Sequence, residues 1–477
     1  TILTGQTNCV LKGDETYYVT GPTYLYGTTI VEAGAVAKYA KTNSPILYLQ
    51  GPVTFLTTPY RPAVFTAKDD NTVGQTINGS SGSPSGTYAG CALRFNHASA
   101  VVDLHHVRVA YANLGTAFYY QLGNTIRHCQ FIRCTRPVFT AGTSTMSISI
   151  QNVLMYGITS EAMYLGNPAG TTTGEHLTLH DVNRVVYYDN RLSLTNSVLA
   201  AVTNWTYAFS GSNNATNSSG TAFQQVGKGL HYLANGSPYR NAGTTNINPR
   251  LLADLRNLTT YPPVVLSNDF TASTTLSPQA QRDTDAPDLG YHYDPLDYCW
   301  SALNLTNGAT LTLTNGVAVG IYGTKGTILR SGTAFISEGR PQALNRLARY
   351  TCVQEGTNAW GTSPTSLNLF ELSGSSPAQA RLTFTDIPFL AGTTSQRQLI
   401  YGQGNYAVNP LALTHCQLRG AYVNFANTTL TSGNNYVNWT NNLIERCTVT
   451  FSRPNYYNPT YVNLFNNLFT KGVHTFT

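Results

Sequence analysis

Charged residues are scarce in this chain. Only 10% of its 477 residues are Asp, Glu, Lys or Arg, against about 25% in an average soluble domain. The 28 basic and 22 acidic side chains leave a net charge of +6. The basic residues form no cluster, which argues against nucleic acid and against an anionic membrane as partners. No run of eighteen apolar residues occurs, so we expect no membrane-spanning helix.

Cysteine pairs of the zinc-binding type are also missing. The eight cysteines are scattered over the whole length, and no two are spaced as Cys-x-x-Cys, so a zinc site is not expected. We interpret them as small buried apolar side chains. The alternative is a few disulfides in a secreted protein, such as Cys129 with Cys134 or Cys9 with Cys91, because connectivity cannot be deduced from sequence.

Runs of the strong helix formers Ala, Glu, Lys and Leu are rare as well. The chain is rich instead in Thr, Ser, Asn, Gly and 31 tyrosines. Thr, Tyr and Val favour pleated strands, whereas Gly and Asn favour tight turns. The composition therefore predicts an all-β protein, with one short helix at 249–258, where Pro249 begins a run with apolar residues at helical spacing.

One short phrase recurs along the sequence: an apolar residue, any residue and a polar residue, with another apolar residue five places after the first. Its polar position is occupied by His106, His128, Asn152, Asn196, Asp386, His415, Arg446 and Asn466. A strand-like phrase that recurs in this way is typical of a solenoid of stacked coils. Because His, Asn and Asp interchange at the polar position, we interpret these residues as structural corners rather than as a functional histidine ladder.

Two glycine-punctuated stretches, 28–62 and 309–341, resemble each other, and each continues into the recurring phrase. Each has short strands broken at glycines, where the chain turns a corner. We therefore predict two β-helical halves at 1–202 and 301–477, with an irregular loop, the short helix and an Asp-rich connector at 203–300. The second half ends without a polar or helical cap, so we expect end-to-end stacking of copies or a fragment of a longer coil.

The segments Tyr60–Asp70 and Pro287–Tyr293, together with the glycine-punctuated strands, resemble secreted bacterial proteins with right-handed parallel β-helix repeats. The resemblance covers nearly the whole chain, and its motifs are architectural rather than catalytic. It implies a pectate-lyase-like, three-sided right-handed parallel β-helix (a β-solenoid) of the non-catalytic surface type. It also implies an extracellular or cell-surface location. The chain starts at Thr1 without Met or a leader, so we take it as a processed or trimmed product.

Carboxylates that could support catalysis are few. Glycoside hydrolysis needs two or three converging acids, and the weak candidates are Asp69, Asp70, Asp103 and His106. The Asn-Thr-Asp, Asp-Asp and Gly-His-Gly pattern of β-helix hydrolases is absent, and so is a lyase-type cluster of calcium-binding acids with a basic residue. We therefore expect no catalytic residues.

The Asp-rich connector contains the only candidates for a metal. Asp283, Asp285 and Asp288 are weak calcium candidates, because Ca²⁺ prefers six to eight hard oxygens. The EF-hand pattern is not met, however, and hydrogen-bonded turns are the preferred interpretation. We therefore expect no cofactor, with calcium as the minor alternative.

The sequence thus predicts an extracellular structural or adhesive β-solenoid that contacts glycans or copies of itself. A polysaccharide lyase or glycoside hydrolase of the β-helix class and a glycan-binding adhesin are the alternatives. Tyrosine pairs at 17–18, 119–120, 187–188 and 456–457 are candidates for contact with sugars. In each pair one ring is expected in the core and one outside, if the pair lies on a strand.

Overall fold

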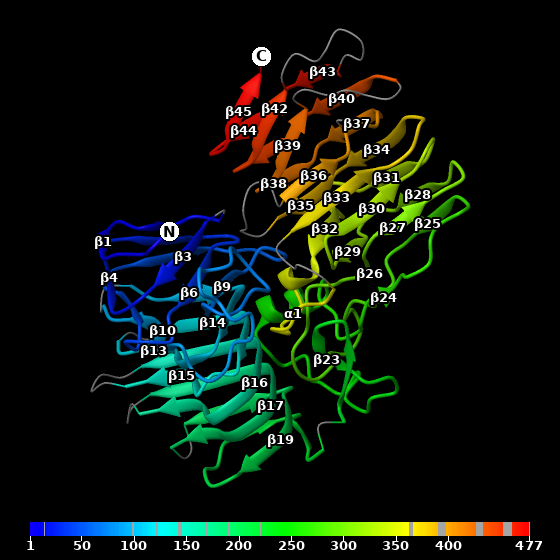
Figure 1. Cartoon of the computed structure of the whole chain (residues 1–477). Helices are drawn as coiled ribbons and strands as arrows, with labels where there is room; N and C mark the ends of the chain where they lie inside the picture. The colour runs from blue at the N-terminus through cyan, green and yellow to red at the C-terminus, as the bar shows by residue number, and fades with distance from the viewer. Residues whose placement is uncertain are drawn as a thin grey trace. The chain divides into compact units, whose positions relative to one another are not determined.

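The chain folds as an all-β parallel β-solenoid of about 18 turns, with 54% of its residues in strands (Figure 1). The computed structural model describes residues 1–13, 15–97, 100–120, 123–141, 146–166, 170–188, 191–219, 221–361, 366–389, 397–403, 405–425, 433–451 and 460–476. The predicted fold class is confirmed. Within the described residues no helix has the length and apolar character needed to cross a membrane.

Two compact units make up the chain. The first contains Thr1–Pro262, Gln281–Pro295 and Gln354–Asn358, and the second contains Pro263–Ala280, Leu296–Val353 and Ala359–Thr477. The region predicted as a connector at 203–300 is therefore shared between the units. Its Asp-rich part, Gln281–Pro295, packs with the first unit.

The strands of the first unit form three rows around one core. The longest strands turn corners and run from one row into the next. The first row holds β2 (Val10–Leu11), β5 (Thr29–Glu32), β8 (Val53–Leu56), β11 (Asp103–His105), β18 (Leu192–Thr195), β20 (Ser210–Ser212) and the first parts of β14 (Asn124–Ile132), β16 (Ser147–Leu165) and β17 (Thr171–Tyr187). The second row holds β3 (Thr16–Val19), β6 (Val36–Tyr39), β9 (Ala63–Ala67), β12 (Val107–Ala110), β19 (Val198–Asn204), β21 (Ala215–Asn217) and the next parts of β14, β16 and β17.

The third row holds β1 (Gln6–Thr7), β4 (Thr23–Tyr26), β7 (Ile46–Leu49), β10 (Ala89–Phe95), β13 (Ala112–Phe118), β15 (Arg136–Thr140) and the last parts of β16 and β17. Among the described residues the strand pairings within these rows are parallel, and each strand pairs with strands of neighbouring coils. Outside the rows lie the antiparallel pair β22 (Phe223–Val226) and β23 (Gly229–Leu233) and the helix α1 (Pro249–Leu255), which begins at the predicted proline.

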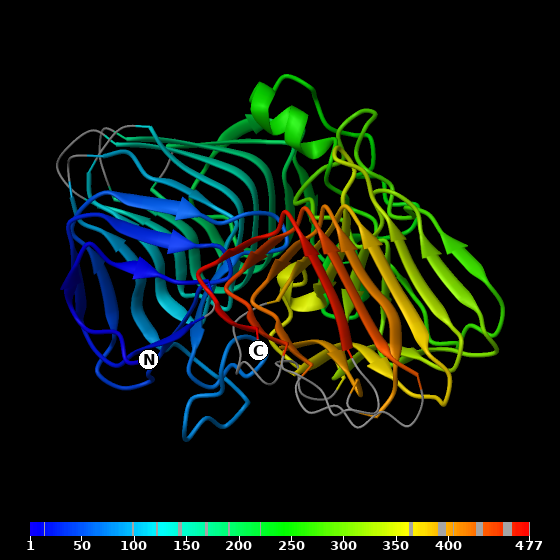
Figure 2. The same ribbon diagram turned by 90° about the horizontal axis from the view of Figure 1, so that it is seen from above.

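The second unit has three parallel sheets whose strands lie side by side (Figure 2). One sheet is β24 (Val264–Val265), β26 (Tyr298–Trp300), β29 (Ala318–Ile321), β32 (Asn345–Arg349), β35 (Thr385–Pro388), β38 (Gln417–Arg419), β41 (Leu443–Glu445) and β44 (Leu468–Thr470). The next is β25 (Thr274–Leu276), β28 (Thr310–Leu313), β31 (Ala334–Glu338), β34 (Ala378–Thr383), β37 (Val408–Thr414), β40 (Asn435–Thr440) and β43 (Thr460–Phe465). The last is β27 (Leu303–Leu305), β30 (Lys325–Leu329), β33 (Leu367–Leu372), β36 (Arg397–Tyr401), β39 (Tyr422–Phe425), β42 (Thr448–Phe451) and β45 (Val473–Phe476), and η1 (Tyr350–Cys352) is a short 3-10 turn.

The core of each unit is a set of apolar ladders, one residue from each coil. In the first unit Val109, Phe131, Met155, Leu179 and Leu199 occupy successive positions of one ladder, and all five are buried. Since parallel strands pair residue by residue, each coil adds one apolar side chain to the same line. The second sheet of the second unit builds the same kind of ladder from Leu311 onward.

The recurring phrase marks a corner of the first unit. His106, His128, Asn152, His176 and Asn196 follow residues in direct register, and all five have a positive φ between 47° and 54°. Asn and His tolerate this left-handed conformation better than most residues other than glycine. The interpretation of His106, His128, Asn152 and Asn196 as one set of structural corners is confirmed, and His176 joins it.

In the second unit the predicted equivalence of His415 and Asp386 is wrong. Thr383 pairs with Thr414, so the residue level with His415 is Phe384, which has a φ of 44° and stacks on the His415 ring at 4.6 Å. Asp386 lies two residues further, inside β35. The phrase matched at Asp386 because the corner residue, Phe384, is itself apolar and therefore fills the first position of the phrase.

All eight cysteines are buried thiols, and none is paired in a disulfide. The thiols of Cys129 and Cys134 lie inside the coil, where burial raises the pKa of both to about 12. The interpretation of the cysteines as small buried side chains is therefore the one that the fold supports.

Candidate functional site

Asp69 and Asp70, two of the predicted catalytic candidates, are buried in a hydrogen-bonded loop. Asp69 accepts hydrogen bonds from Tyr88 Oη at 2.5 Å and from the Ser81 amide at 2.7 Å. Asp70 accepts from the hydroxyl of Thr66 at 2.8 Å and from the amide of Thr72 at 2.9 Å. Burial opposes ionisation of Asp69, but the hydrogen bonds from Tyr88 and Ser81 hold its pKa below the usual value. Both carboxylates thus stabilise the loop.

Asp103 and His106 have separate partners. Asp103 accepts hydrogen bonds from two nitrogens of Arg127, from Nε at 3.0 Å and from Nη2 at 2.9 Å. The His106 ring is buried in the corner, with its Nδ1 3.3 Å from that of His105 and its face stacked on His128 at 5.0 Å. The four predicted candidates are therefore not brought together in one site by any contact among the described residues.

Asp283 and Asp288, two of the calcium candidates, lie together with His292, with one ligand atom of each within 4.8 Å of the others. Asp283 Oδ2 lies 2.7 Å from His292 Nε2 and accepts the amide of Asp288 at 2.9 Å. Asp288 is held by Arg240 at 3.2 Å. Asp285 is exposed and is not part of this group. The carboxylates already have protein donors, as in the hydrogen-bonded turns that the sequence predicts, and calcium stays an untested prediction.

A row of aromatic rings, interrupted by one arginine, runs along the third row of strands. Tyr24, Tyr48, Arg94, Ala117, Phe139, Tyr164 and Tyr187 occupy successive register positions. The small Ala117 leaves a gap in this line, and Tyr119 from just beyond β13 lies between Arg94 and Phe139. We call Tyr24, Tyr48, Arg94, Tyr119, Phe139, Tyr164, Tyr187 and Tyr207 the aromatic ladder.

The rings of the aromatic ladder are in direct contact from coil to coil. Tyr24 and Tyr48 stack with centroids 4.3 Å apart, Phe139 and Tyr164 at 4.8 Å, and Tyr164 and Tyr187 at 5.2 Å. Tyr207 continues the line at 4.9 Å from Tyr187. Every member is half-buried or exposed. Since stacked rings cover each other's faces, it is their edges that meet the solvent.

Arginines are interleaved with these rings. The Arg94 guanidinium lies over both neighbouring rings, 5.0 Å from the centroid of Tyr48 and 4.5 Å from that of Tyr119. Arg136 and Arg184 flank Tyr164 and Tyr187 and share one buried carboxylate, Glu161. Guanidinium groups over aromatic faces are attracted by the ring quadrupole. The surface therefore combines stacked rings with an excess of positive charge.

Part of this surface was expected. Tyr119 and Tyr187 belong to the predicted tyrosine pairs and lie in the ladder, whereas Tyr17 is buried and donates to the Val10 carbonyl. The pair at 456–457 lies outside the described residues. Sequence reasoning missed Arg94, because its register with Tyr48 depends on how the intervening loop is placed.

A second arrangement with chemical potential is a hydrogen-bonded relay in the first unit. Glu355 Oε1 accepts from Leu230 N at 2.8 Å and Tyr293 Oη at 3.0 Å, and lies 2.7 Å from His231 Nδ1. His231 Nε2 lies 2.9 Å from His180 Nδ1. Glu355 and His231 are fully buried, while His180 is partly exposed. Burial, followed by the nearby His231, lowers the pKa of His180 to about 4.

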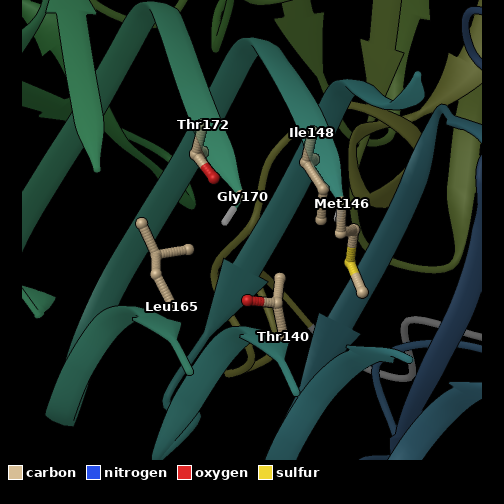
Figure 3. Close-up of a pocket in the computed structure, with 6 residues that line it drawn as sticks. All are labelled: Thr140, Met146, Ile148, Leu165, Gly170 and Thr172. Carbon is tan, nitrogen blue, oxygen red and sulfur yellow. The ribbon is translucent and has the colours of Figure 1, made fainter. Parts of the chain in front are cut away.

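The cavity in Figure 3 lies between the coils of β15, β16 and β17 and is lined by Thr140, Met146, Ile148, Leu165, Gly170 and Thr172. Its volume of about 10 Å³ leaves room for about one water molecule,. It is a packing defect rather than a ligand site.

No protein-family model matches the chain, and no curated protein is similar to it in sequence. Among solved structures, a mutant of an alginate lyase of family PL6 is similar over 99% of this chain and 97% of that chain. The two share 9% sequence identity, with a TM-score of 0.18.

Proposed function

We propose that this chain is an extracellular β-solenoid that binds glycans along the aromatic ladder. The single observation that supports it is the combination, in the described part of the chain, of stacked rings on neighbouring coils with arginines that have few acidic partners. Stacking alone would stabilise neighbouring coils. Such stabilisation does not require a guanidinium between Tyr48 and Tyr119. Ring edges on successive coils, about 4.8 Å apart, with guanidinium groups beside some of them, suit a polymer with a short repeat.

Removing one ring should weaken binding by interrupting this row. For Tyr164→Ala we expect binding of the best ligand in a panel of soluble polysaccharides to weaken by about two- to tenfold, since an aromatic contact contributes about 0.5–1.5 kcal/mol. Isothermal titration calorimetry gives the affinity, and circular dichroism checks the fold. Tyr461→Ala is a matched control, because Tyr461 also stacks on a tyrosine, Tyr436, at 4.8 Å, but in the second unit. Equal affinities of both variants and the parent protein would exclude the ladder as the binding surface.

Cleavage of a polysaccharide is the second candidate, and the relay from Glu355 through His231 to His180 favours it. A proton on His231 Nδ1, directed at the Glu355 carboxylate, leaves His231 Nε2 to accept the Nδ1 proton of His180, so the outer Nε2 of His180 carries a lone pair. Within the described part of the chain this nitrogen has no hydrogen-bond partner. A positioned neutral imidazole is the commonest general base in enzymes.

The enzymatic candidate predicts release of oligosaccharides from at least one acidic or neutral polysaccharide. His180→Ala should reduce that release at least a hundredfold, the usual contribution of a general base being about 10²–10⁴. Chromatography of the digest measures it, with His97→Ala as a control, since His97 is another partly exposed histidine of the first unit. If the parent protein releases nothing from any polymer, the relay serves stability alone.

A further inference from the structure

We propose that Arg94 receives an anionic group of the bound polymer, so that the ladder selects acidic polysaccharides over neutral ones. The chemical class is a carboxylate or sulfate carried on a sugar repeat. This inference rests on the proposed glycan-binding function and adds to it the class of ligand and the residue that determines specificity.

Arg94 is held in place without being neutralised. It lies in β10, level with Tyr48 on one side and with Ala117 on the other. The rings of Tyr48 and Tyr119 lie on either side of its guanidinium. Because the guanidinium is planar and stacks on both rings, little further conformational freedom is lost when it binds an anion.

Among the described residues, the hydrogen-bond donors of Arg94 lack acceptors. Within the described residues no carboxylate forms an ion pair with it and no oxygen accepts from it, and its Nε is buried without a partner. A buried donor without an acceptor costs free energy. A carboxylate or sulfate oxygen at the outer nitrogens of this half-buried side chain would form charge-assisted hydrogen bonds with the guanidinium,. A neutral sugar hydroxyl would do so only weakly.

The neighbouring charges are mostly positive. Arg136 and Arg184 share only Glu161, and Arg191 lies over the ring of Tyr188 at 5.2 Å. Among the described residues, Arg94, Arg136, Arg184 and Arg191 thus accompany the aromatic ladder together with the buried carboxylate of Glu161. Charges repeated from coil to coil favour a polyanion over a single small anion.

A single-stranded nucleic acid is the other polyanion that aromatic residues and arginines bind. Nucleic-acid bases bind by stacking on exposed ring faces, whereas in this ladder Tyr24 stacks on Tyr48 and Tyr164 lies between Phe139 and Tyr187. The geometry therefore favours recognition through ring edges and guanidinium groups, as a polysaccharide requires.

The test uses matched polymers with the full chain. Polygalacturonate and its fully methyl-esterified form differ in the carboxylate charge, and dextran sulfate and dextran differ in the sulfate. We expect the parent protein to bind one charged polymer at least tenfold more tightly than its neutral counterpart. The charged polymer that shows this preference identifies the anionic group. Arg94→Met should remove the preference, while Arg381→Met, which removes an exposed arginine of the second unit, should change it less than twofold.

The outcomes separate this inference from the proposed function. If Arg94→Met keeps the full preference, Arg94 is not the specificity determinant, although the surface still binds glycans. If the parent protein binds charged and neutral polymers equally, the inference is wrong and glycan binding stands. If it binds none of the four, the proposed function itself fails, and tighter binding of oligothymidylate would assign the surface to nucleic acid. Arg94→Lys keeps the charge but loses the planar group, so it should retain part of the preference. Retained preference would also show that a substitution at this position leaves the protein folded.

Discussion

The protein should lose stability steeply as the pH falls from about 6.5 towards 4. Burial keeps the pKa of His106 and His176 well below the ordinary value of 6.5, and lowers that of His105 and His180 to about 4. In this pH range the unfolded chain therefore binds protons that the native protein does not. Stability from these histidines is complete above pH 6.5 and is lost as the pH falls towards their native pKa.

The expected slope is large, because several histidines act together. Each histidine that is protonated only on unfolding contributes up to about 1.4 kcal/mol per pH unit, and His106 and His176, whose pKa values lie well below 6.5, should contribute most. Urea unfolding at pH 7, 6 and 5 measures the slope. These pH values lie above the range in which Asp69, Asp103 and Asp254, whose pKa values are lowered, take up protons.

The corner positions offer a matched control for this prediction. Asn152 and Asn196 occupy the same corner as His106 and His176 with nearly the same φ. The double variant His106→Asn/His176→Asn should therefore fold at pH 7 and show a markedly smaller pH slope. An unchanged slope would mean that these histidines do not titrate on unfolding.

Removing Glu355 should destabilise the protein by about 3–5 kcal/mol, the usual effect of breaking a buried ion pair or hydrogen-bonded charge. Glu355 Oε1 is the shared acceptor for Leu230, His231 and Tyr293. Glu355→Ala would leave these three groups buried without an acceptor. The cost is large because water does not reach the site to replace the carboxylate.

Chemical denaturation at pH 7 measures this loss. Glu355→Gln keeps a carbonyl oxygen for Leu230 and Tyr293 and should cost less than Glu355→Ala. Glu338→Ala is the control, since Glu338 is exposed and such substitutions usually change stability by at most about 0.5 kcal/mol. Similar stabilities of Glu355→Ala and Glu338→Ala would show that the relay contributes nothing to the fold.

The corner of the first unit could be predicted from sequence because each coil repeats the same local pattern. The recurring phrase does not match at His176, because Gly174 stands where Leu104, Ile126 and Ile150 supply its apolar residue. At Asp386 the sequence matches the phrase but the residue does not lie at the corner, because a match to the pattern does not determine which residues pair between strands,. Local chemistry predicts corners, whereas register is a property of neighbouring coils.

The candidate sites depend on contacts that a local pattern does not contain. Arg94 meets Tyr48 across 46 positions of sequence because the residues between β7 and β10 leave the third row and return. Glu355 reaches His231 from a segment, Gln354–Asn358, that is separated in sequence from the rest of its unit. The tyrosine pairs hinted at an aromatic surface, but only the fold shows which rings share a line.

Because each coil pairs only with the coils beside it, the free energy of unfolding of this protein is a sum of local contributions along the chain. In such a linear array every coil contributes its own free energy and that of two interfaces. Amide hydrogen exchange should therefore be slowest in the middle coils of each unit and fastest where a coil has one neighbour. A polymer lying across many coils would link these local openings, so binding would protect the amide groups of every coil that it spans.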